Sequence, residues 1–145
     1  MNTSTTEYGT ALLRLALGVM FIAHGLLKPV VYTMTGSVQF FETVGFPGWL
    51  AYVVLAAELI AGTLLIVGYR TRIVAAATLP ILLGAAWVHL PNGWVFSAPN
   101  GGWEYPVFLA VAVVAQILLG DGALAFGRTR VGATRSPRAS GILSH

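Results

Sequence analysis

Four long apolar runs follow one another along the chain, and each is about as long as a membrane span. They cover approximately residues 9–28, 47–67, 72–90 and 104–120. A helix rises about 1.5 Å per residue, so roughly 20 mainly apolar residues are needed to cross about 30 Å of hydrocarbon. A proline or glycine stands at or just beyond the end of each run, where helices usually end. The pattern predicts an all-α fold, a bundle of four transmembrane helices.

The composition favours a surface that faces lipid rather than water. Of the 145 residues, 57% are hydrophobic and 9% are charged, whereas soluble globular domains carry about 25% charged residues. So little charge excludes a soluble enzyme, a disordered chain and a coiled coil. The absence of cysteine excludes a disulfide framework, a thiol nucleophile and a thiolate-bound metal. A formal charge of +3 is too small for a nucleic-acid surface, so no nucleic acid partner is expected.

The positions of the arginines predict how the bundle is oriented. Arg70 and Arg72 lie where the second run gives way to the third, and four more arginines lie between residues 128 and 138. On the opposite side the only Lys or Arg residue in the sequence is Lys28, at the edge of a span. Because short loops rich in Lys and Arg stay in the cytoplasm, we expect both termini on the cytoplasmic side.

The two ends of the chain carry different expectations. Residues 1–128 are predicted to form the transmembrane domain, and residues 129–145, rich in Gly, Ser, Pro and Arg, a disordered basic tail attracted to anionic lipid. The first run is not expected to be a signal peptide, because its flank is acidic at Glu7 and Arg14 interrupts its apolar stretch.

Several polar side chains stand where lipid should exclude them. A charge at the centre of a span costs about 2.5–3.5 kcal/mol, so such residues usually face the bundle and have a role. Depths counted from the rise per residue predict two layers. The deeper layer consists of Arg14, Glu58 and Gln116, and the outer layer consists of His24, Lys28, His89 and Glu104.

Glu58 is the most informative of these residues. A carboxyl group in mid-span is either paired or protonated, and Arg14 is its expected partner at the same depth. The small residues Ala61 and Gly62 follow on the same helix face, which favours a face packed against another helix. Each polar residue also has a purely structural interpretation. Glu58 could form an ion pair that only holds two helices together, and Arg14 could extend to the cytoplasmic surface. The histidines and Gln116 could form hydrogen bonds between helices without a further role.

Aromatic residues gather in the two outer loops, near residues 29–46 and 91–103. They are Phe40, Phe41, Phe46, Trp94, Phe96 and Trp103. Aromatic side chains at this level usually form the interfacial belt, and glycines in both loops also allow the tight turns of a structured lid.

Four motifs, in order, resemble the DoxX family of small four-helix membrane proteins. They are RLALGVMFIAHGLLK in the first run, AAELIAGTLLIVG followed by YRTR in the second, AAWVHL at the end of the third and GGWEYPVFL at the start of the fourth. The resemblance covers about residues 10–122. The chain departs from the family at its end, where a Gly-x-Gly-x-x-Ser-[Leu/Ile]-Asp pattern is frequent and this sequence reads GDGALAFGR.

The resemblance implies a multi-pass protein of the bacterial inner (plasma) membrane that is linked to redox chemistry. The namesake of the family looks like the membrane subunit of a thiosulfate:quinone oxidoreductase. Fold analogy alone does not fix a function, so the resemblance gives an oxidoreductase expectation without a substrate.

The leading hypothesis is a quinone-interacting subunit of a membrane oxidoreductase system. His24, Glu58 and His89 are the candidate catalytic residues, as hydrogen-bond donors and proton carriers. Candidate ligand-binding residues are Arg14, Lys28, Glu104 and Gln116. No bound metal or flavin is expected, because the sequence has no metal-ligand cluster and no dinucleotide glycine motif. Electrons would come from a soluble or membrane redox partner or from a small molecule, and a homo-oligomer is an open option.

Two hypotheses of other classes stay open. A buried acid and base in the bundle fit a small proton-coupled transporter or channel. A non-catalytic membrane scaffold for a redox partner needs the polar residues only to set the register of the helices. A haem held between His24 and His89 is a minor option. The molecule that co-purifies in detergent distinguishes these classes.

Overall fold

The computed structural model describes residues 3–126, and within them the chain is entirely helical apart from turns and loops. The elements are α1 (Thr3–Val30), α2 (Met34–Thr43), α3 (Leu50–Val67), α4 (Thr71–His89), the short 3-10 helix η1 (Leu90–Asn92) and α5 (Glu104–Leu119). The predicted all-α class is confirmed. The predicted basic tail lies outside the described residues.

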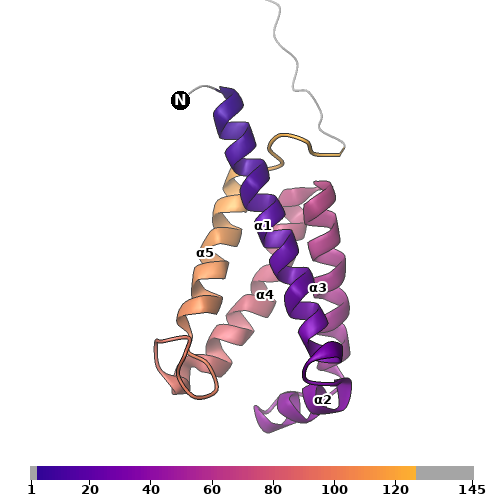
Figure 1. The fold of residues 1–145 in the computed structure, drawn as a ribbon, viewed down its shortest axis with the longest axis vertical. Coiled ribbons are helices and arrows are strands. Elements are labelled where there is room, and N and C mark those ends of the chain that lie inside the picture. The colour runs from indigo at the N-terminus through magenta and orange to yellow at the C-terminus, as the bar shows by residue number, and fades with distance from the viewer. Residues whose placement is uncertain (1–2, 127–145) are drawn as a thin grey trace, which may run out of the picture.

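Two helix pairs make up the bundle (Figure 1). The most extensive contacts join α1 to α3 and α4 to α5, and fewer contacts join one pair to the other. The N-terminal end of α1, the turn between α3 and α4 and residues 120–126 lie at one end of the molecule. The helix α2 and the loop 91–103 lie at the other end. We call these the N-terminal end and the α2 end.

Glycines bring the backbones of α1 and α3 together. A Cβ atom at Gly62 would lie 2.7 Å from the carbonyl oxygen of Gly18, and one at Gly18 would lie 2.8 Å from that of Gly62. Small residues permit such close approach of helices in membranes. This confirms the prediction that the Ala61–Gly62 face of α3 packs against another helix.

Within residues 3–126, three helices are long and apolar enough to cross a membrane. They are the helices over Ser4–Val30, Leu50–Val67 and Thr71–Asn92. The predicted fourth span is the shorter apolar helix α5, with 16 residues. Large apolar side chains such as Ile60, Ile73 and Phe108 are each at least 60% exposed, which a lipid-facing surface explains and a water-facing one does not.

The loop predicted over residues 29–46 contains the additional helix α2. Thr33 begins it: its hydroxyl oxygen accepts a hydrogen bond from the backbone N–H of Gly36 at 3.1 Å, as N-cap residues commonly do. On the other side, α1 continues through Pro29 to Val30, two residues beyond the predicted end of the span. The α2 end of the molecule therefore holds more ordered structure than the aromatic pattern alone indicated.

Residues 120–126 fold back across the N-terminal end of the bundle, and we call this segment the strap. The backbone N–H of Ala123 donates to the carbonyl oxygen of Glu7 on α1 at 2.9 Å. That of Phe126 donates to the carbonyl oxygen of Val67, the last residue of α3, at 3.1 Å. The strap therefore links the ends of α1, α3 and α5.

A pair of cysteine variants tests whether α5 crosses the membrane. Ser97 precedes α5 and Leu124 follows it, and both are exposed. Because the chain has no cysteine, each of Ser97→Cys and Leu124→Cys carries a single thiol. In intact cells a membrane-impermeant maleimide should label Ser97→Cys, and should label Leu124→Cys only after permeabilisation. Equal labelling of both thiols from one side would mean that α5 does not cross.

Candidate functional site

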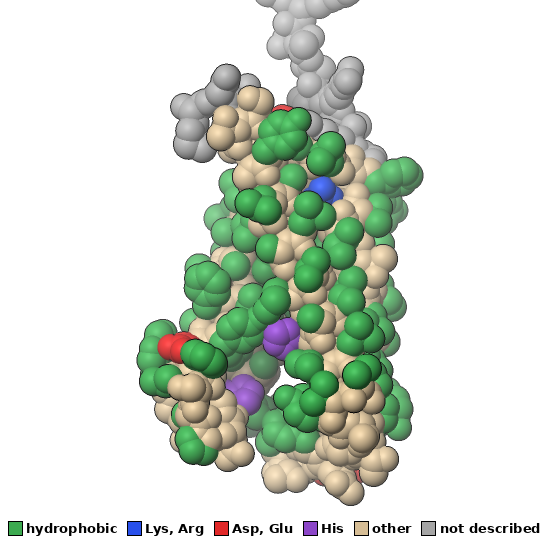
Figure 2. Space-filling view, viewed as in Figure 1, with side chains coloured by type: hydrophobic (Ala, Val, Ile, Leu, Met, Phe, Trp, Pro, Cys, Tyr) green, Lys and Arg blue, Asp and Glu red, His purple; other side chains and the backbone are tan. Residues whose placement is uncertain are grey.

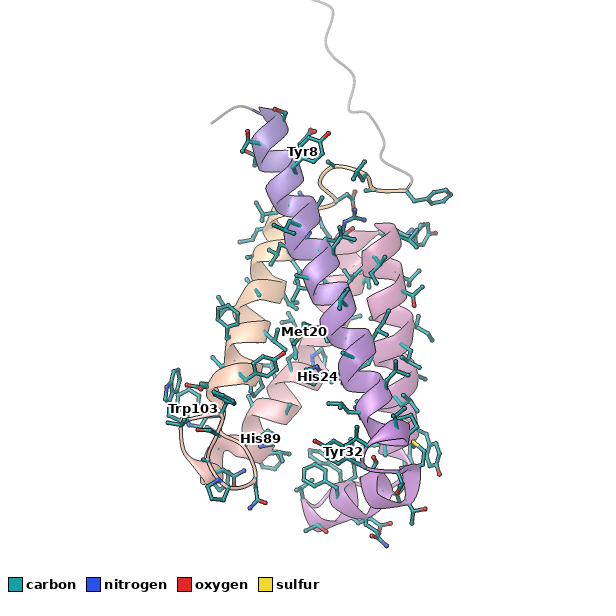
Figure 3. All side chains as sticks on the ribbon, in the orientation of Figure 1. Tyr8, Met20, His24, Tyr32, His89 and Trp103 are labelled. Atoms are coloured by element: carbon teal, nitrogen blue, oxygen red, sulfur yellow. The ribbon has the colours of Figure 1, made fainter. Side chains whose placement is uncertain are left out.

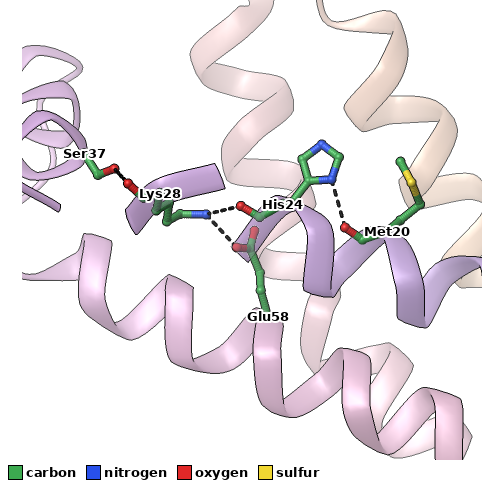
Figure 4. Close-up of polar contacts among 5 residues, drawn as sticks. All are labelled: Met20, His24, Lys28, Ser37 and Glu58. Carbon is green, nitrogen blue, oxygen red and sulfur yellow. Dashed lines mark hydrogen bonds and ion pairs between the residues drawn. The ribbon is translucent and has the colours of Figure 1, made fainter. Parts of the chain in front are cut away.

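His24 is held on the inner side of α1 by two contacts (Figures 3 and 4). Its ring is stacked on that of Tyr105 in α5, with centroids 5.5 Å apart and an interplanar angle of 20°. Its Nδ1 lies 2.9 Å from the carbonyl oxygen of Met20, one turn earlier on α1. The phenolic hydroxyl of Tyr105 also contacts the sulfur of Met20, at 3.6 Å. These three side chains thus join α1 to α5.

One helical turn beyond His24, Lys28 forms an ion pair with Glu58 of α3 (Figure 4). The Nζ–Oε2 distance is 2.6 Å, and the two side chains are 14% and 8% exposed. Lys28 Nζ also lies 3.5 Å from the carbonyl oxygen of His24. Gly25 lies close against α3 here, because a Cβ atom there would be 3.1 Å from Cδ2 of Leu59. The predicted shared face of His24 and Lys28 is confirmed.

The prediction that Arg14 pairs with Glu58 is wrong. The two helices run antiparallel, and Arg14 lies against Gly68, where α3 ends, rather than against Glu58. Ten residues separate those two positions on α3, which corresponds to about 15 Å. The depth estimate failed because α1 extends to Val30 and α3 begins only at Leu50. These shifts move Arg14 deeper and Glu58 nearer the α2 end.

Arg14 and Gln116 instead belong to a second polar group, under the strap. Arg14 is 1% exposed, and its Nη2 donates to the carbonyl oxygen of Ala123 at 3.1 Å. Gln116 is fully buried, and its Nε2 donates to the carbonyl oxygen of Gly120 at 2.7 Å. The carboxylate of Asp121 accepts from the backbone N–H of Thr71 at 3.2 Å. This group fastens the strap to α1, α4 and α5.

His89 ends α4 and lies beneath the loop 91–103. The amide nitrogen of Asn92 lies 3.4 Å from His89 Nδ1, and it also donates to the carbonyl oxygens of Asn100 and Gly101 at 3.0 and 2.9 Å. A Cβ atom at Gly101 would be 3.5 Å from the His89 ring, so the loop passes directly over the histidine.

Glu104 helps to close this loop. Its Oε1 accepts a hydrogen bond from the backbone N–H of Phe96 at 2.9 Å. Trp94 and Trp103 pack edge to face, with centroids 4.4 Å apart. Loop 91–103 is therefore an ordered element with its own hydrogen bonds, as the structured-lid interpretation of its glycines requires.

A hollow opens between this loop and α2, and both described histidines lie at its wall (Figures 2 and 3). Figure 2 shows the two histidine side chains on one face of the molecule, beside the hollow. Figure 3 shows that His24 comes from α1 and His89 from α4. The structure therefore places His24 and His89 beside one hollow. Lys28 lies one turn beyond His24 on α1, where it pairs with Glu58 of α3. The structure leaves Arg14 and Gln116 at the opposite end.

The hydrogen-bond partners of the two Nδ1 atoms indicate which nitrogen of each histidine ring carries the proton. A carbonyl oxygen can only accept, so His24 Nδ1 donates to Met20 and the Nε2 of a neutral ring is an acceptor. An amide NH₂ can only donate, so the 3.4 Å contact from Asn92 favours the neutral tautomer of His89 in which Nδ1 accepts and Nε2 carries the proton. No hydrogen bond joins either Nε2 to another described residue. His24 Nε2 thus presents a hydrogen-bond acceptor to the hollow, and His89 Nε2 presents a donor.

Sequence reasoning missed three residues of this site. Met20 and Asn92 set the orientation of the two histidine rings, and Tyr105 packs against one of them. Met20 lies four residues before His24, a spacing that places both on one helix face. Tyr105 stands next to Glu104, which was selected for its charge. An aromatic residue at the start of an apolar helix is usually a belt residue, so its pattern gave no signal.

Comparisons with known proteins point to one family. The DoxX family model matches residues 9–90, from the first turns of α1 to just beyond the end of α4. The chain is 46% identical over 79 residues to the Bacillus subtilis (strain 168) protein named "Putative oxidoreductase CatD". This match covers 54% of the chain and 58% of that relative, so the chain spans little more than half of the relative's length. No solved structure matches the chain.

Proposed function

The chain belongs to the DoxX family of membrane proteins, and from this premise we propose that it is a quinone-binding membrane subunit of an oxidoreductase system. The similar Bacillus subtilis protein carries an oxidoreductase name, which supports the reaction class. In this proposal the helices α1, α3, α4 and α5 all cross a bacterial plasma membrane, with the N-terminal end in the cytoplasm. Electrons come from a redox partner or a small reductant.

The observation that carries the proposal is the pair of histidines at the hollow. A quinone ring has carbonyl oxygens that accept hydrogen bonds, and its reduced form has hydroxyl groups that donate them. The Nε2–H of His89 suits a carbonyl oxygen, and the Nε2 of His24 suits a hydroxyl group. Tyr105, stacked on His24 at 5.5 Å, supplies an aromatic wall. The chemistry of these groups therefore fits a quinone.

Reduction of a bound quinone consumes two electrons and two protons. Glu58 is a buried acid, and Lys28, which pairs with it, lies one turn from His24 on α1. Histidine and carboxyl groups are common general acids and bases. We assign proton transfer at the hollow to His24, His89 and Glu58, and assign Lys28 to positioning Glu58.

The core of the bundle supports proton exchange at the α2 end. On α1 the apolar core residues Leu17 and Phe21 lie between Arg14 and His24, and on α5 Leu109 and Val113 lie between Tyr105 and Gln116. These buried side chains separate the polar group under the strap from the site at the hollow. A proton-coupled transporter would need a polar route through them, so this arrangement favours the quinone-binding function.

Quinone affinity and thermal stability, measured on the same preparations, test the proposal. One net hydrogen bond contributes about 0.5–1.5 kcal/mol, so His24→Ala and His89→Ala should each weaken quinone binding about two- to tenfold. Leu26→Ala is the matched control, since Leu26 lies two residues from His24 and is 44% exposed on the outer face of α1. Unaltered affinity in both histidine variants would overturn the proposal, and lowered melting temperatures with unaltered affinity would leave the histidines a structural role.

A further inference from the structure

An apolar groove runs along α5 beside the loop 91–103. Its volume is about 470 Å³, and it is lined by Trp94 and Phe96 from the loop and by Tyr105, Val107, Phe108 and Val111 from α5. Glu104 is the one charged lining residue, and its carboxylate already accepts the backbone N–H of Phe96. The remaining walls are aromatic or aliphatic, so the groove suits a hydrocarbon ligand rather than a polar one.

Tyr105 belongs to both the groove and the histidine site. Its ring lines the groove and is also stacked on His24. The groove therefore begins beside the place where the head of a bound quinone would lie. No other residue of α5 contacts His24 through its ring within the part of the chain that the structure describes.

The direction of the groove matches the direction that the tail of an amphiphile must take. From Tyr105 to Val111 the lining residues advance six positions, or about 9 Å, from the start of α5 towards its middle. Phe108 and Val111 are 67% and 63% exposed on the lipid-facing side. A head group at the α2 end thus leaves its tail pointing along α5 into the hydrocarbon, where burial of each methylene group is favourable.

We propose that this groove binds the apolar side chain of the quinone, so that the substrate class is a long-tailed membrane quinone. The inference rests on the proposed quinone site at His24 and His89 and assigns a second subsite to the same ligand. Tyr105 then lies between the ring of the quinone and its side chain. The other groove residues determine the preference for side-chain length without contacting the quinone ring.

Two quinones that share a ring, one with a methyl and one with a decyl side chain, test the inference in lipid nanodiscs. Val111→Trp fills the groove. Val114→Trp is the matched control, because Val114 is also lipid-exposed, at 44%, but does not line the groove. Val111→Trp should reduce the ratio of decyl to methyl affinity about tenfold, which is comparable to losing two buried methylene groups. The control should keep the wild-type ratio, and partition of the tail into lipid cancels in this comparison.

A second variant tests the groove by removing a wall instead of filling it. Phe108→Ala should also lower the decyl-to-methyl ratio, with methyl-quinone affinity unchanged. An unchanged ratio in both variants would overturn the tail site, while methyl-quinone binding that depends on His24 would still support the proposed function. Loss of co-purified phospholipid with an unchanged ratio would make the groove a lipid site and overturn the inference. Failure of both quinones to bind the wild-type protein would overturn both proposals.

Discussion

Gly68→Ala is expected to destabilise the protein by more than about 3 kcal/mol. Gly68 ends α3 with φ +77°, a conformation that costs an L-residue about 1–2 kcal/mol. The added methyl group would also occupy the position of the Arg14 guanidinium group. Arg14 would have to leave the carbonyl oxygen of Ala123, which exposes or strands a buried charge, and that costs several kcal/mol.

Gly45→Ala is the matched control for this substitution. Gly45 has a similar φ of +87°, but a Cβ atom there meets nothing within 4 Å. The free energy of unfolding of the Gly45→Ala variant should therefore fall only by the cost of placing alanine in that backbone conformation. The difference between the two variants, measured by denaturant titration in mixed micelles, gives the combined cost of displacing Arg14 and the strap at Ala125, whose Cα would lie 2.7 Å from the added atom. Equal losses in both variants would show that Arg14 moves aside freely and does not fasten the strap.

The spans were predictable because they depend on one strong property, the length of an apolar run. Three of the four predicted runs are helices long enough to cross a membrane. The boundary at Gly68 was also predictable, since a glycine in the left-handed conformation commonly ends a helix. The helix α2 was missed because its ten residues lie in a segment whose aromatic side chains suggested an interfacial loop, and its N-cap, Thr33, has no distinctive neighbours in sequence.

Pairing between helices was much harder to predict than the helices themselves. The depth of Glu58 depends on where α3 begins, and an error of three residues there shifts the estimate by about 4.5 Å. Lys28 stands at the end of an apolar run, a position typical of a boundary residue, although its long side chain can reach back into the bundle. The sequence therefore identified Lys28 and Glu58 as informative residues without identifying them as partners.

The orientation of the site residues depends on contacts that have no signature in sequence. His24 and His89 were both selected as candidates, but their complementary hydrogen bonding follows from Met20 and Asn92. Either residue would look ordinary at its position in a helix or a turn. A single sequence thus gives the chemically unusual side chains, whereas the neighbours that orient their rings become visible only in the folded chain.

Removal of one member of the Lys28–Glu58 pair is expected to cost about 3–5 kcal/mol. The pair is close, with a distance of 2.6 Å, and neither side chain is more than 14% exposed. Lys28→Met leaves the carboxylate of Glu58 without its partner, and Glu58→Leu leaves the ammonium group of Lys28 without its own. Each single variant should therefore melt at a clearly lower temperature in detergent than the wild-type protein.

The double variant Lys28→Met/Glu58→Leu separates an uncompensated charge from a lost packing contact. Replacing both ions by apolar groups of similar size is often neutral or stabilising, since no charge remains to be desolvated. The double variant should therefore recover most of the stability that either single variant loses.

Glu42→Gln, at an exposed position of α2, is the control and should change the free energy of unfolding by about 0.5 kcal/mol or less. If the losses of the two single variants simply add, the ion pair is not what holds α1 against α3. If stability recovers but quinone binding does not, the buried charges serve the site rather than the fold, because an apolar pair can replace their packing but cannot carry a proton.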